Sequence, residues 1–77
     1  MNQEQSSQIY KQIEIVGSSP DGVDAAVVAA LERASQSLHG LRWFEVVSIR
    51  GGIEDEQIRE WQVTLKVAFV LDDADKS

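Results

Sequence analysis

The 77-residue chain is long enough for one small domain, and its 13 acidic against 7 basic residues give a net charge of -6. This balance argues against nucleic acid or an anionic membrane as the main partner. The absence of cysteine excludes disulfides and thiolate metal sites, and no apolar run approaches the ~20 residues that span a bilayer. We therefore expect a cytoplasmic domain that is marginally stable alone and gains stability from oligomerisation.

The first half of the chain predicts a strand followed by a helix. Residues 1–8 are polar and predict a disordered tail. Residues 9–16 predict a strand, because Ile13 and Ile15 share one parity, and the segment 17–20 ends it. Ser19 followed by Pro20 predicts the helix start, since the hydroxyl can accept a bond from a free amide of the first turn.

The helix is predicted to run to about His39, with Gly40 as its C-cap. Its apolar residues form one stripe, and polar residues point elsewhere. The stripe is rich in alanine, so the helix can approach a sheet closely. Its members are Val23, Ala26, Val27, Ala30, Leu31, Ala34 and Leu38.

The second half predicts two more strands, residues 41–53 and 57–71, joined by a turn at residues 54–56. Gly51-Gly52 predicts a bend or bulge before that turn. Every second residue from Trp61 to Leu71 is apolar, which is typical of a strand with one face on a core. Trp61 belongs to that face and is predicted to be a core residue. Residues 72–77 predict a polar tail.

The predicted fold is α+β in the order β-α-β-β, a single domain over residues 9–71 with a three-stranded antiparallel sheet packed on one helix. One helix covers one face of a sheet, so the other face, with Trp43, Gln62, Ala68 and Val70, lacks cover. We infer that other copies of the chain cover it and that any ligand site lies between subunits.

Several linked segments, in this order and spacing, resemble the dodecin family over roughly residues 9–71. They are Val16-Gly17-Ser18-Ser19, Leu38-His39-Gly40-Leu41, Arg42-Trp43-Phe44-Glu45-Val46-Val47, Ile49-Arg50-Gly51 and Trp61-Gln62-Val63-Thr64-Leu65-Lys66-Val67-Ala68-Phe69. The resemblance implies a flavin-binding storage protein whose twelve copies form a hollow shell. It also implies that the protein performs no turnover chemistry and has no catalytic residues.

In dodecins, paired flavins stack between tryptophans of symmetry-related chains, and the resemblance implies that Trp43 is this tryptophan. It likewise implies that Gln62 bonds the polar edge of the flavin ring. Offset stacking contributes about 0.5–1.5 kcal/mol per pair beyond burial, and a primary amide carries both a donor and an acceptor. Indole is a good electron donor, so a stacked tryptophan can return an excited flavin to its ground state, which is photoprotective.

Four further residues bear on the ligand. At Val70 some dodecins carry an arginine that reaches the flavin phosphate, which valine cannot do, so FMN and riboflavin both stay open. Arg50 keeps a cation near the outer end of the site, and Ser48 can approach the sugar-like chain. Some dodecins also bind coenzyme A, and Lys11 and Arg33 are the candidates here for holding its phosphates.

Each of these residues also has an ordinary structural interpretation. A lone tryptophan is most often core, and Arg50, Lys11 and Arg33 can serve in ion pairs. A coenzyme A-binding or purely structural shell protein is one alternative function. A small enzyme using His39 and Glu45 as acid and base is another, although no nucleophile motif accompanies them. The acidic turn at residues 54–56 lacks the ligand spacing of a calcium loop, so no metal site is predicted.

Overall fold

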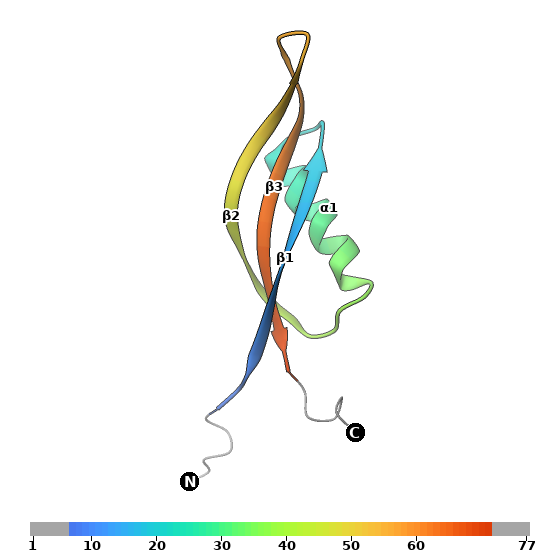
Figure 1. The fold of residues 1–77 in the computed structure, drawn as a ribbon. Helices are drawn as coiled ribbons and strands as arrows, with labels where there is room; N and C mark the ends of the chain where they lie inside the picture. Colours follow the sequence, from blue (N-terminus) through green and yellow to red (C-terminus); the bar gives the residue numbers. More distant parts are fainter. Residues whose placement is uncertain (1–6, 72–77) are drawn as a thin grey trace.

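The computed structural model describes residues 7–71, which form one sheet and one helix (Figure 1). The elements in chain order are β1 (Tyr10–Ser19), α1 (Val23–Ser35), β2 (Leu41–Glu54) and β3 (Gln57–Val70). The sheet is antiparallel throughout, in the strand order β1-β3-β2. The predicted β-α-β-β fold is therefore confirmed, whereas the predicted terminal tails lie almost wholly outside the described residues.

The predicted helix start at Ser19-Pro20 is wrong. Strand β1 continues past Val16 to Ser19, and α1 begins only at Val23, after Gly22. The Ser19 hydroxyl does accept a bond from a backbone amide, that of Asp21 at 3.0 Å, but this bond closes a turn rather than capping the helix. Gly22 has a φ of 139°, a value that glycine adopts without steric cost, and this lets the chain leave the turn and enter the helix.

The helix also ends earlier than predicted, at Ser35 rather than near His39. The Ser35 hydroxyl donates to the Glu32 carbonyl at 2.9 Å, a local bond that competes with continued helix. Gly40 does not cap the helix. Its φ is 74°, and it lies in the link to β2, where its carbonyl accepts a bond from the Val70 amide at 3.3 Å.

The turn between β2 and β3 is as predicted, with Glu54 paired to Gln57 and the two residues between them at the tip. Asp55 and Glu56 both have positive φ, 54° and 64°, as a two-residue hairpin turn with the right twist requires. The predicted irregularity at Gly51-Gly52 is confirmed by a register shift between Gly52 and Ile53.

The core lies where α1 packs on β1 and β3. Val63, Leu65 and Val67 of β3 are almost fully buried, which confirms the alternation predicted for that strand, and Trp61 is half-buried on the same side. The helix presents its alanines, Ala26, Ala30 and Ala34, to the sheet. A Cβ atom on Gly17 would overlap the Ala26 carbonyl oxygen and lie 2.8 Å from the Ala30 Cβ. Helix and sheet therefore touch at Gly17 with no room for a side chain.

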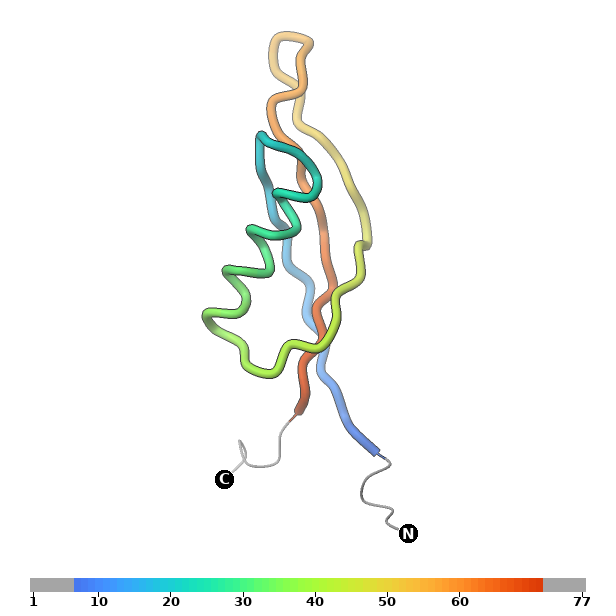
Figure 2. Tube along the Cα trace, turned by 180° about the vertical axis from the view of Figure 1, so that it is seen from behind, coloured from blue at the N-terminus to red at the C-terminus, as the bar shows by residue number. Residues whose placement is uncertain are grey.

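The helix leaves more of the sheet open than the sequence predicts. It packs on β1 and β3, and Figure 2 shows β2 running apart from it. Phe44, Val46 and Ile49 of β2 are consequently 44%, 41% and 51% exposed. The molecule measures 61 × 22 × 14 Å with a radius of gyration of 16.3 Å, against about 11 Å for a compact chain of this length. Within residues 7–71, no helix is long and apolar enough to cross a membrane.

We expect Gly17→Ala to destabilise the fold by about 1–3 kcal/mol, because the helix must move away from the sheet to admit the methyl group. Thermal unfolding followed by circular dichroism should show a midpoint lower by at least about 4 °C. Gly51→Ala is the matched control, since a Cβ there meets its nearest atom at an ordinary 3.4 Å. Equal midpoints for the two variants would contradict the close approach.

Candidate functional site

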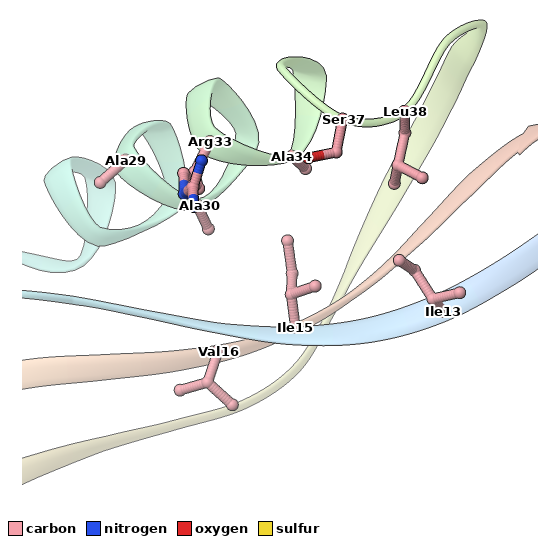
Figure 3. Close-up of a pocket in the computed structure, with 9 residues that line it drawn as sticks. All are labelled: Ile13, Ile15, Val16, Ala29, Ala30, Arg33, Ala34, Ser37 and Leu38. Atoms are coloured by element: carbon pink, nitrogen blue, oxygen red, sulfur yellow. The ribbon is translucent and has the colours of Figure 1, made fainter.

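The register of β3 decides which side chains share a face, because residues directly opposite in antiparallel strands point to the same side. Gly17 faces the helix and pairs with Val63. The neighbouring residue Gln62 therefore points to the opposite side, which we call the open face because α1 does not cover it. Figure 3 shows the same alternation on β1, where Ile15 points toward the helix and Val16 away from it.

A β-bulge at Val47 brings the predicted flavin residues together on the open face. In an unbroken strand, Trp43 and Arg50 have opposite parity and would point to opposite sides. The register shift between Val46 and Ser48 reverses the alternation after Val47, so Arg50 points to the same side of the sheet as Trp43. Trp43 then lies opposite Ala68, Ser48 opposite Thr64 and Arg50 opposite Gln62. All four predicted flavin residues, Trp43, Ser48, Arg50 and Gln62, thus lie on the open face.

Trp43 is packed against a second ring that the sequence analysis missed. The centroids of Tyr10 and Trp43 are 4.8 Å apart with an interplanar angle of 60°, a favourable tilted arrangement. These two residues form the aromatic pair. Ala68, between their strands in the register, is fully buried although it points to the open face. Trp43 itself stays 47% exposed, so it is braced on one side and free on the other.

Gln62 is held between a cation and an anion. The Arg50 Nε donates to the Gln62 Oε1 at 2.8 Å, and the Gln62 Nε2 donates to the Glu60 Oε2 at 3.1 Å. We call these three residues the amide triad. Arg59 adds a further contact of 3.4 Å to the same Glu60 oxygen. Glu60 was not predicted as a site residue. Its position two residues from Gln62 in β3 places both on the same face, but the hydrogen bond between them depends on the conformations of both side chains.

One chain does not close a site around both features. Trp43 lies beside Ala68, whereas Gln62 is six residues away along β3. At about 3.3 Å per residue this separation is roughly 20 Å. Neither an indole nor an amide spans such a gap by itself. A ligand that touches both kinds of group must therefore take them from different copies of the chain.

Charged side chains fill the open face between the two features. Lys66 on the central strand lies opposite Glu14 on one side and Glu45 on the other. Opposite charges at such positions stabilise a sheet. This placement favours an ion-pairing role for Glu45 over an acid–base one. Among residues 7–71, no three His, Asp or Glu side chains gather in a way that could hold a metal ion.

Arg33 lines a groove on the other side of the sheet, between α1 and β1 (Figure 3). Its Nη1 donates to the Gln36 Oε1 at 3.0 Å. The walls are mostly apolar, with Ile13 and Ile15 of β1 facing Ala30 of the helix. Lys11 is not among the residues that line this groove. The structure thus does not bring the two predicted coenzyme A residues together there, and their role stays a prediction.

The fold and its open face define a class of small α+β protein with one face of its sheet left uncovered. The dodecin family model matches residues 9–72. A dodecin from Thermus thermophilus is 48% identical over 65 residues, which cover 84% of this chain and 94% of that protein. The structure of the dodecin from Streptomyces davaonensis matches with a TM-score of 0.84 and 54% identity, covering 88% of this chain and 100% of that one.

A dodecin structure from Streptomyces coelicolor is equally similar, with a TM-score of 0.85 and 54% identity over 88% of this chain and 97% of that one. The chain therefore belongs to the dodecin family. The resemblance seen in the linked sequence segments is confirmed, and the three-stranded fold predicted from the sequence pattern matches these dodecin structures.

The aromatic pair should show measurable coupling. In a double-mutant cycle with Tyr10→Ala and Trp43→Ala, we expect a coupling energy of about 0.5–1.5 kcal/mol from unfolding experiments. A parallel cycle with Tyr10→Phe is the control, because phenylalanine keeps the ring contact, so this cycle should give a coupling energy near zero. A coupling energy near zero in the alanine cycle would show that Tyr10 does not brace Trp43.

Proposed function

We propose that this dodecin binds a flavin between subunits, stores it and quenches its excited state, without turnover chemistry. The observation that carries the proposal is Trp43, half-exposed on an uncovered sheet face and braced from one side by Tyr10. A large aromatic side chain with one free surface is suited to stack on a flat ring. The contact with Tyr10 limits the motion of the Trp43 side chain before the ligand binds. Less conformational entropy is then lost on stacking, which favours affinity.

The proposed site needs at least two chains. The roughly 20 Å along β3 between Trp43 and Gln62 prevents one chain from presenting both to one flavin ring. The ring would stack on Trp43 residues of different copies, and a Gln62 would bond the polar edge of its pyrimidine portion. Ser48, beside Thr64, and Arg50 are the candidates for contacting the ribityl chain and its outer end.

A homo-oligomer follows from the same surfaces. The elongated sheet is uncovered on its open face and along β2, where Val46 and Ile49 are exposed on the helix side. Exposed apolar surface of this kind marks protein contacts. We propose that copies of the chain cover it, and the number twelve comes from the family. The protein would act as a cytoplasmic store in which a contacting indole donates an electron to the excited flavin and so quenches it.

We expect added riboflavin to quench the tryptophan fluorescence of the purified protein, and Trp43→Ala to weaken riboflavin binding by at least about tenfold, since each stacked ring contributes about 1–3 kcal/mol. The readout is the dissociation constant from fluorescence titration of the flavin. Trp61→Phe is the matched control, because Trp61 lies on the helix side of the sheet and its replacement should leave the affinity unchanged.

Sedimentation of both variants should show an assembled particle. A loss of riboflavin affinity can then be attributed to the binding site and not to a failure of the subunits to assemble. A mass spectrum of the compounds released on denaturation identifies the natural ligand. If wild-type protein releases no flavin and riboflavin leaves its tryptophan fluorescence unquenched, the flavin proposal fails. A released coenzyme A would instead favour the alternative that assigns Lys11 and Arg33 to its phosphates.

Val70 bears on which flavin is bound. It lies on the open face opposite Tyr10 and offers no charge to a phosphate. We expect riboflavin and FMN to bind with similar affinity, and Val70→Arg to favour FMN over riboflavin by about tenfold, the effect of one charge-assisted hydrogen bond. Val70→Met is the control that adds length without charge. A ratio of affinities that is the same in the arginine and methionine variants would contradict this role for position 70.

A further inference from the structure

We propose that Glu60 is a positioning residue that sets the orientation of the Gln62 amide, and that the amide then selects a ring edge with an N–H beside a carbonyl. The inference rests on the proposed flavin function and adds to it a specificity residue and the chemical group recognised. It starts from the two hydrogen bonds of the amide triad.

The two neighbours of Gln62 admit only one orientation of its amide. An arginine Nε is only a donor, so the amide oxygen must face Arg50, at 2.8 Å. A carboxylate is only an acceptor, so the amide nitrogen must face Glu60, at 3.1 Å. Rotating the amide by half a turn would set donor against donor and acceptor against acceptor. The triad therefore fixes which end of the amide each ligand atom meets.

The groups left free by the triad define the ligand edge. An amide oxygen has two acceptor sites and an amide nitrogen has two hydrogens. Arg50 takes one acceptor site and Glu60 takes one hydrogen. One acceptor and one donor of the same amide remain for a ligand. Their complement is a ring N–H next to a ring carbonyl, which is the edge that the pyrimidine portion of a flavin presents.

The same two bonds strengthen the free groups. A donor on the amide oxygen makes the remaining N–H a better donor, and an acceptor on the nitrogen makes the remaining lone pair a better acceptor. Both partners are charged, and charge-assisted bonds are the stronger ones. Glu60 therefore acts through Gln62 and does not touch the ligand itself.

Glu60 lies beside a glycine on the facing strand. Gly52 pairs with Glu60, and a Cβ atom on Gly52 would lie 3.4 Å from the Glu60 Cγ and 3.7 Å from its Oε2. These are ordinary contact distances, so the Glu60 carboxylate lies directly beside the facing strand. The Glu60 side chain is only 24% exposed, whereas that of Arg59, its other partner, is 57% exposed.

The test compares riboflavin with 3-methylriboflavin, which stacks equally well but has a methyl group in place of the ring N–H. Wild-type protein should bind 3-methylriboflavin at least about tenfold more weakly, the cost of one unmade buried hydrogen bond. Glu60→Gln keeps the size of the side chain but can accept or donate, so it no longer constrains the amide nitrogen, and only Arg50 still orients the Gln62 amide. In this variant we expect the ratio of the affinity for riboflavin to that for 3-methylriboflavin to fall by at least about threefold.

Glu56→Gln removes the same charge at the hairpin tip and should keep the wild-type ratio. Glu60→Ala is a second variant, which removes the acceptor altogether and should also lower the ratio. A ratio unchanged in both Glu60→Gln and Glu60→Ala, or a wild-type ratio near one, overturns the role of Glu60 while leaving flavin binding intact. If neither flavin binds to wild-type protein, the proposed function itself has failed.

Discussion

The register of β3 against its two neighbours is the constraint on which the rest of the structure depends. As the central strand, it fixes which residues of β1 and β2 face the helix and which face away. The bulge at Val47 is the decisive irregularity. Without it, Trp43 and the Arg50–Gln62 pair would lie on opposite sides of the sheet, and the candidate site would not exist on any single surface.

Small residues determine how closely the layers meet. Gly17 lets the helix touch the sheet, and the helical alanines keep that contact short. The resulting core is thin, since one short helix covers only two of the three strands. A chain of this size with so little buried surface is expected to be only marginally stable as a monomer. The same geometry that exposes β2 and the open face thus makes association with further copies physically favourable.

Stability and binding are coupled in this arrangement. The aromatic pair and the amide triad occupy the same face but are separated by six residues along β3. A ligand that uses both must sit where two copies meet, so assembly precedes a complete site. A ligand bound there would in turn stabilise the assembled state over the separated chains. In the proposed site, Glu60 would add a finer level of control, because its carboxylate accepts a hydrogen bond from the Gln62 amide.

The sequence alone determined the element order, the apolar alternation of β3, the alanine-rich helix face and the family. These follow from local periodicity and linked motifs, which are properties of neighbouring residues. It misplaced both helix ends. The Ser19 hydroxyl accepts from the Asp21 amide in a turn before the helix, and the Ser35 hydroxyl bonds the Glu32 carbonyl where the helix ends, ahead of Gly40. Only the tertiary structure decided that Tyr10 braces Trp43 and that Glu60 holds Gln62. Those contacts depend on strand register, bulges and side-chain conformation, which no local pattern specifies.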